Sequence, residues 1–490
     1  MKLFLKLAGL LFAIVLIFLI GFYSGKSNRS YTVDSMAEKL KHNLMNPISD
    51  AAQISGRKLV LLENPEIIGR IMEGGSFGND DFSVAAAQNM FSKNESAIED
   101  IIDKTSIQQV SANVWLIRMP IVNCTLIETA KGLVLIDTGM KPAGPALLKA
   151  IRSISKKPIH TIIYTHGHVD HCYGTWALME AGENPQIIAQ SNIKARFERY
   201  VQLRGSIAKY MSQPSEQLPH NLTEIVLPTR YFDNELSLEI GGEEIVLKHF
   251  NGETDDQLFV WLPAQRILLA ADYYQGFLPN AGNGKRVQRY VDDWIVALKT
   301  MAALKPDIML PSHGEKIKGS EIIQKDLRIL TEALEYIFNK TINGLNAGLR
   351  KDQIFQSIEL PEHLKNYPLL KEQYVTAKDI SKMIIRQYTG WWDDIPSHWS
   401  PASIEAQAKQ IVALSGGMDK LILFIRKLTN QDLALAAHFT DWAYFAEPQN
   451  SDVQQLVLDI YKRRIMSDES VTQEMLVYLD HMAAVREQMK

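Results

Sequence analysis

The sequence predicts an α/β sandwich followed by a long all-α region, with an apolar segment at the N-terminus. Short apolar runs alternate with amphipathic helical stretches over residues 109–320. From residue 321 onward the periodicity is helical to the last residue. We therefore expect a signal anchor or signal peptide over 1–30, a polar lead over 31–108, the sandwich over 109–320 and the helical region over 321–490.

Residue patterns predict the elements in order. In the lead, helical stretches are expected at 36–45 and 85–91. In the sandwich, apolar β-branched runs bounded by polar residues predict strands, and longer amphipathic runs predict helices. The expected strands are 134–136, 162–164, 245–248, 266–269 and 308–310, the sandwich helices are 143–154 and 292–304, and two amphipathic stretches follow at 421–445 and 453–465.

Composition indicates a large globular protein. The chain has 490 residues, of which 46% are hydrophobic and 22% are charged, so it can bury the core of two or more domains. A net charge of −4 without a polybasic field excludes nucleic acid as an expected partner. The two cysteines, Cys124 and Cys172, cannot form a disulfide framework.

The N-terminal segment predicts export. Residues 7–24 carry no charge and follow Lys2 and Lys6, as in a signal peptide or signal anchor. Phe22 and Tyr23 interrupt the small-residue pattern of a cleavage site, which favours an uncleaved transmembrane helix. We expect a protein anchored in the inner membrane and facing the periplasm, or a periplasmic protein if the segment is cleaved.

A dense cluster of metal-ligand residues follows the apolar run 162–164. His166, His168, Asp170 and His171 lie within six positions of a chain that has only 12 histidines. Two-residue spacing at a strand end points His166 and His168 the same way, and the next two ligands face a second position. Imidazole and carboxylate groups suit Zn²⁺, with Fe or Mn as alternatives. Cys172 is either a small filler beside this site or a soft ligand.

This His-x-His-x-Asp-His pattern resembles that of the metallo-β-lactamase superfamily. Ser312-His313-Gly314 looks like the last ligand histidine of that superfamily, and Ala270-Ala271-Asp272 looks like its bridging carboxylate. Residues 134–139 resemble its strand-Asp-x-Gly element, in which Asp137 would steady a ligand histidine through a hydrogen bond. The resemblance implies an αββα sandwich over 109–320.

The segment Asn251-Gly252-Glu253 places a glutamate where most of the superfamily has a histidine. This substitution resembles the alkyl sulfatase branch, whose corresponding glutamate is a metal ligand. His249 is the alternative ligand, although it belongs to the predicted strand rather than to the loop after it.

The helical region also resembles that branch. Residues 374–401 are similar to its dimerisation region, which implies a homodimer, and the stretches 421–445 and 453–465 are similar to a tetratricopeptide-type hairpin. We expect the chain to lack the sterol-carrier-like domain that the branch often carries.

The resemblance implies a binuclear metal-dependent hydrolase with two Zn²⁺ per chain. His166, His168 and Glu253 would bind one ion, and Asp170, His171 and His313 the other. Asp272 would bridge the two ions. Asp170 and Asp272 are the expected catalytic residues, and a metal-bound hydroxide is the expected nucleophile.

A small anionic ester is the expected substrate, most simply an alkyl or related sulfate. Such an anion needs donors besides the metals. The family's His-Asn pair is here Pro279-Asn280, and Lys285 or Arg286 replaces its arginine. The expected substrate-binding residues are Asn280, Lys285, Arg286, Arg230 and Arg204, with Arg289 as a further candidate.

Two other function classes stay open. Another binuclear hydrolase of this fold would act on a lactone, thioester, β-lactam or phosphoester. A non-catalytic, membrane-tethered scaffold would keep the metals only for structure.

Overall fold

The computed structural model describes residues 56–75, 84–211 and 213–489. Among the described residues, contacts define two compact units, one within residues 74–400 and one that joins residues 56–73 to 401–489. The helical region that we expected over 321–490 is therefore shared between the two units. The ligand cluster belongs entirely to the unit of residues 74–400.

The first sheet of that unit has seven strands, which lie side by side in chain order. Its first four strands are antiparallel, and the following three add in parallel. The central strand β4 is buried along its whole length and therefore reads as a continuous apolar run. The strands are β1 (Ser106–Gln109), β2 (Val114–Arg118), β3 (Asn123–Thr129), β4 (Gly132–Ile136), β5 (Ile159–Ile163), β6 (Gln186–Gln190) and β7 (Arg230–Phe232).

The second sheet has six strands in the order β13-β12-β11-β10-β9-β8. Only the β11 and β12 pair is parallel, because helix α12 connects these two strands. The strands are β8 (Glu235–Ile240), β9 (Glu243–His249), β10 (Leu258–Leu262), β11 (Ile267–Ala271), β12 (Ile308–Pro311) and β13 (Ile317–Lys318), and α12 is Val291–Ala303.

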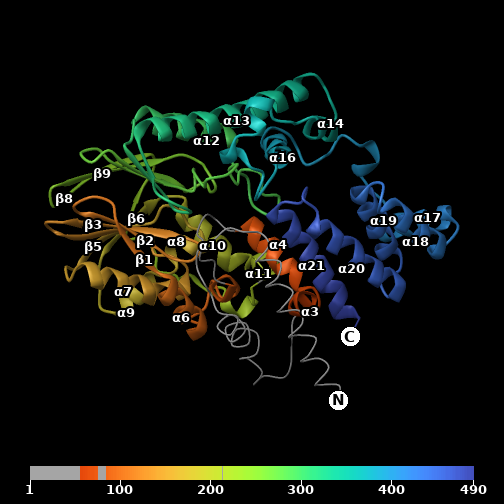
Figure 1. Cartoon of the computed structure of the whole chain (residues 1–490), viewed down its shortest axis with the longest axis horizontal. Helices are drawn as coiled ribbons and strands as arrows, with labels where there is room; N and C mark the ends of the chain where they lie inside the picture. The colour runs from red at the N-terminus through yellow and green to blue at the C-terminus, as the bar shows by residue number, and fades with distance from the viewer. Residues whose placement is uncertain (1–55, 76–83, 212, 490) are drawn as a thin grey trace, which may run out of the picture. The chain divides into compact units, whose positions relative to one another are not determined.

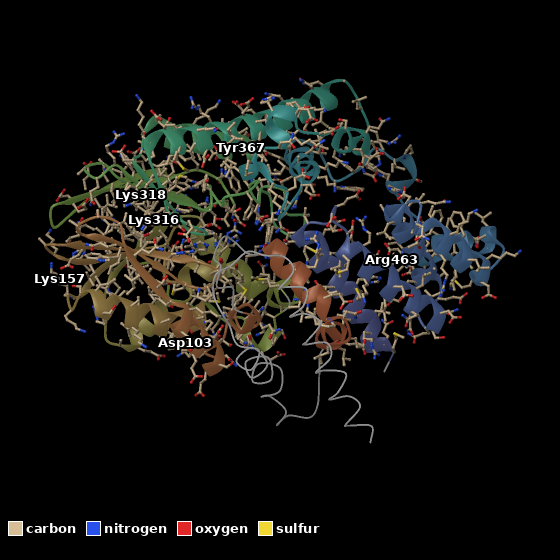
Figure 2. The ribbon with its side chains drawn as sticks, viewed as in Figure 1. Asp103, Lys157, Lys316, Lys318, Tyr367 and Arg463 are labelled. Atoms are coloured by element: carbon tan, nitrogen blue, oxygen red, sulfur yellow. The ribbon has the colours of Figure 1, made fainter. Side chains whose placement is uncertain are left out.

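The two sheets face each other across one apolar core and are covered by helices on their outer faces. Val114 and Ile163 of the first sheet share this core with Leu247 and Leu269 of the second. Figure 1 shows α7 (Gly144–Ile154) and α9 (Thr175–Glu180) against one sheet and α12 with α13 (Ser320–Asn346) over the other. Charged side chains such as Lys157 and Asp103 lie at the periphery (Figure 2). The predicted αββα sandwich is confirmed.

Several shorter helices complete this unit. The helices expected at 143–154 and 292–304 are confirmed within one residue by α7 and α12. The remaining helices are α5 (Val84–Gln88), α6 (Glu95–Lys104), α8 (Val169–Cys172), α10 (Ile193–Gln202), α11 (Arg204–Met211), α14 (Lys351–Gln356), α15 (Glu362–Lys365) and α16 (Ala377–Tyr388).

The other unit is all-helical. Its core contains Leu421, Ala443, Val457 and Leu479, one from each of four successive helices. The first of its helices pairs with the last, where the Gly56 amide donates to Glu487 Oε1 over 2.6 Å. The helices are α3 (Gly56–Glu63), α4 (Pro65–Gly75), α17 (Ile404–Ser415), α18 (Met418–Leu428), α19 (Leu433–Ala446), α20 (Ser451–Met466) and α21 (Thr472–Gln488).

The expectation of one amphipathic stretch over 421–445 is wrong. The chain leaves the helix after Leu428 and starts a new helix at Leu433. Asp432 caps the new helix, because its side chain accepts a hydrogen bond from the Leu435 amide. The stretch expected at 453–465 lies within α20 and is confirmed.

The predicted membrane segment at 7–24 and the predicted helix at 36–45 lie outside the described residues. Among the helices that the structure does describe, none has the length and apolar character needed to cross a bilayer.

Candidate metal centre

The predicted ligands meet at one edge of the sandwich, where strands of both sheets end. Ala271 pairs with Pro311 in the parallel ladder of β11 and β12, so Asp272 and His313 follow neighbouring strand ends. The cluster that begins at His166 follows β5 of the opposite sheet. The Leu258 amide bonds to the Thr165 carbonyl over 2.9 Å and ties the two sheets together at this edge.

Two groups of potential metal ligands form there. His166, His168 and Asp272 make the first group, and Asp170, His171 and His313 make the second. Within each group the ligand atoms lie within 4.8 Å of one another. In the first group His166 Nε2 and His168 Nδ1 are 3.0 Å apart, so both imidazoles face a common point.

Asp272 lies between the two groups. Its Oδ2 is 3.8 Å from His166 Nε2 and 3.3 Å from His313 Nε2, and its Oδ1 is 3.6 Å from His171 Nε2. His171 Nε2 and Asp272 Oδ1 are buried and have no hydrogen-bond partner among the described residues. Two orphaned ligand atoms that face each other indicate a cation site.

Backbone and carboxylate groups orient the second pair of imidazoles. Asp137 Oδ2 lies 2.8 Å from His171 Nδ1, and the same carboxylate accepts hydrogen bonds from the Thr165 amide and hydroxyl. His313 Nδ1 contacts the Ile121 carbonyl. Both imidazoles therefore direct Nε2 toward the candidate metal centre, because a contact at Nδ1 fixes the orientation of each ring.

Electrostatics differ between the two groups. Burial lowers the pKa of His166 and of His168 well below the usual value, so these imidazoles are neutral ligands. Burial also acts on His313, but the carboxylates of Asp272 and Asp170 outweigh it and raise the pKa of His313 to about 9. The same two carboxylates that favour a proton on His313 would favour a metal cation in its place.

Glu253 stands apart from the two ligand groups. It is only 6% exposed, and three side chains donate to its carboxylate. Asn280 Nδ2 and Arg289 Nη2 lie 2.6 and 2.8 Å from Oε1, and Gln275 Nε2 lies 2.9 Å from Oε2. Burial and the neighbouring Asp272 carboxylate raise the pKa of Glu253, against the opposing effect of Arg289. Its predicted role as a ligand stays a prediction.

The two alternative ligands lie outside both groups. His249 ends strand β9, and its Nδ1 is 2.7 Å from the Gln257 carbonyl. The Cys172 thiol is buried and donates to the His168 carbonyl over 3.1 Å, which fits a small filler under the ligand loop.

The predicted substrate-binding residues separate into two sets. Asn280, Lys285 and Arg286 lie in the loop between β11 and α12, and the positive charge of Arg286 acts on His168. In contrast, Arg204 contacts the exposed His220, and Arg230 is exposed on the edge strand β7. Among the described contacts, none joins Arg204 or Arg230 to the ligand groups.

Several supporting residues had not been predicted. Asn123 donates from its side chain to the Pro311 and Gly314 carbonyls, over 3.0 and 2.8 Å, and so holds the turn of His313. Asp256 accepts a hydrogen bond of 2.6 Å from the Gly167 amide. The side-chain oxygen Asp256 Oδ1 also lies 3.3 Å from Arg196 Nε. These residues are far from the ligand motif in sequence and carry no motif of their own.

Comparison with known proteins agrees with this geometry. Residues 118–313 match the metallo-beta-lactamase superfamily, and residues 350–488 match the alkyl sulfatase dimerisation domain. A linear primary-alkylsulfatase of Pseudomonas sp. (strain ATCC 19151) is 30% identical over 326 residues, which are 61% of either chain. An alkyl/aryl-sulfatase of Saccharomyces cerevisiae is 24% identical over 387 residues, 72% of this chain and 59% of the relative. The chain thus spans less than two thirds of the length of these relatives.

A solved structure shares the fold. The inverting sec-alkylsulfatase Pisa1 from Pseudomonas sp. superimposes with a TM-score of 0.70 at 19% identity, covering 85% of this chain and 70% of that one. The chain described here therefore carries a region that matches the metallo-β-lactamase superfamily, followed by a region that matches the alkyl sulfatase dimerisation domain.

Proposed function

We propose that this protein is a zinc-dependent hydrolase that cleaves alkyl or related sulfate esters. The observation that carries the proposal is the position of Asp272 between two groups of buried ligand atoms. Relatives that match 61% and 72% of this chain are named a linear primary-alkylsulfatase and an alkyl/aryl-sulfatase, which supports a sulfate ester as the substrate.

The residues present fit two divalent ions. Imidazole and carboxylate donors without thiolate favour zinc over softer metals. His166 and His168 would hold one ion, with Glu253 as the third ligand that the family resemblance implies. Asp170, His171 and His313 would hold the other, and Asp272 would contact both. When bound, zinc supplies Lewis acidity and lowers the pKa of a bound water to about 7.

The surrounding residues prepare the site for this chemistry. Asp137 keeps His171 in the orientation that presents Nε2. The carboxylates of Asp170 and Asp272 supply negative charge at the position where a nucleophile must lose a proton. Asn280, Arg286 and Arg289 belong to one loop and lie on the side of the candidate metal centre that faces Glu253. An anionic substrate can bind on that side.

Export and membrane attachment are further parts of the proposal. They rest on the uncharged residues 7–24 and the two lysines before them. We place the enzyme at the inner membrane facing the periplasm, or free in the periplasm if the segment is cleaved.

A homodimer is the proposed assembly. The match of residues 350–488 to a dimerisation domain supports it. Within that match, Trp391 and Trp399 are 76% and 63% exposed, and their ring centroids lie 5.4 Å apart with the rings tilted, so apolar surface is available for a second copy.

The first prediction concerns the reaction. The purified enzyme should release inorganic sulfate from dodecyl sulfate faster than it hydrolyses nitrocefin or a lactone, because the loop cations favour an anionic ester. Turnover of nitrocefin or the lactone without sulfate release would support another binuclear hydrolase. Two bound metals without turnover of any substrate would support the scaffold.

The second prediction concerns metal content. The portion from residue 30 onward should bind about two zinc ions per chain, measured by elemental analysis. His168→Ala should abolish activity, and Asp272→Ala should lose at least one ion. His160→Ala is the matched control, because His160 is exposed on β5, the strand that precedes the ligand cluster, and its loss should leave the zinc content unchanged. A wild-type chain with one ion or none at saturating zinc would reject the binuclear centre.

The third prediction distinguishes the two possible ligands of the first ion. Glu253→Ala should weaken the binding of one zinc ion, whereas His249→Ala should retain both, because His249 ends strand β9 and lies outside both ligand groups. Zinc affinity is measured by competition with a chromogenic chelator. The opposite result would move the ligand to His249 and remove the main sequence argument for the sulfatase branch.

The fourth prediction concerns assembly. Light scattering of the purified protein should give twice the mass of one chain. Trp391→Ser combined with Trp399→Ser should weaken the dimer, because the pair exposes most of its indole surface. A wild-type mass of one chain at working concentration would argue against a homodimer.

A further inference from the structure

Arg289 is a buried cation with unused hydrogen-bond donors beside the metal centre. Its side chain is only 1% exposed, and Nη2 donates to Glu253 Oε1 over 2.8 Å. Its Nε and Nη1 groups are also buried, and neither has a hydrogen-bond partner among the described residues. Burying such donors of a charged group without an acceptor is unfavourable, so the position indicates an absent acceptor.

Glu253 does not account for the whole guanidinium. Its Oε1 already accepts from Asn280 Nδ2 over 2.6 Å, and its Oε2 accepts from Gln275 over 2.9 Å. The Glu253 carboxylate accepts three hydrogen bonds, and only one of them comes from Arg289, through Nη2. The contact fixes the plane of the guanidinium and leaves the other donors available.

The surroundings of Arg289 favour an anion. Arg286 lies close enough for its positive charge to repel that of Arg289, and the positive charges of both residues act on His168. Two cations of one loop therefore converge on the first ligand group. An oxyanion beside His168 would relieve their repulsion and satisfy the unused donors.

We propose that Nε and Nη1 of Arg289 bind non-bridging oxygens of the substrate's sulfate group. This inference rests on the proposed function, and it assigns the anion contact to Arg289 rather than to Lys285, which the resemblance to the family would favour. Lysine is a mobile point charge, whereas Arg289 is a planar donor held in place by Glu253.

Binding of inorganic sulfate to the zinc-loaded enzyme tests the proposal without turnover. Arg289→Lys keeps a positive charge for Glu253 but removes the additional donors, so sulfate should bind about ten- to hundredfold more weakly by calorimetry. Zinc content, measured on the same samples, should stay at the wild-type value. Arg266→Lys is the matched control, because Arg266 is exposed and pairs with Asp307.

The alternative outcomes are distinct. Unchanged sulfate affinity in Arg289→Lys at equal zinc content would overturn the proposal, as would a larger loss in Lys285→Ala. If the Arg289 variant does not fold, a wild-type crystal soaked in sulfate tests the proposal instead. The proposal requires the anion within hydrogen-bond distance of Arg289 Nε or Nη1, and sulfate bound elsewhere would overturn it. Sulfate bound through Arg289 without hydrolysis of any sulfate ester would uphold this inference and reject the proposed function. Hydrolysis of a sulfate ester with sulfate bound away from Arg289 would support the proposed function and reject this inference.

Discussion

The burial of ionisable ligands between two sheets is the constraint on which the rest of the structure depends. Imidazoles and carboxylates lose hydration when they are buried, and each must regain a partner. Here the partners come from opposite sheets, since His313 after β12 lies 3.7 Å from Asp170 in the turn after β5. The sheets cannot slide past each other without separating these groups. The register of the sandwich and the geometry of the site are therefore set together.

Local backbone strain accompanies this arrangement. Ile121, Asp137 and Ala271 have positive φ angles of 78°, 59° and 47°, which cost on the order of 1 kcal/mol each for residues with a side chain. All three contact a ligand or precede one. Gly174 is needed for a different reason, because a Cβ atom there would lie 2.0 Å from the Thr138 carbonyl oxygen. The apolar core of the sandwich therefore offsets the conformational free energy that these residues cost at the edge where the ligands lie.

The sequence could predict what is local or periodic. Strands β4, β5 and β11 and helices α7 and α12 follow from continuous apolar or amphipathic runs, and four ligand candidates follow from one short motif. Asp272 and His313 could be found only through resemblance, because nothing in their own segments separates them from ordinary polar residues at strand ends. Contacts between segments far apart in the sequence, such as that of Arg196 with Asp256, could not be predicted, because no local pattern encodes them. The break at Asp432 was missed because one cap interrupts an otherwise continuous amphipathic pattern.

The pairing of Arg289 with Glu253 changes the charge balance of the centre. The two proposed divalent ions would exceed the charge of three carboxylates, Asp170, Asp272 and Glu253, by one unit, and the metal-bound hydroxide expected as the nucleophile would cancel that unit. Arg289 would then supply one net positive charge, in a buried position where solvent screens it poorly. A neutral ester would gain little from this charge, whereas a sulfate monoanion would gain a favourable interaction before any bond is broken. Under the proposed assignment Glu253 would serve selectivity in two ways, because it lowers the cost of burying Arg289 and fixes the direction of its remaining donors.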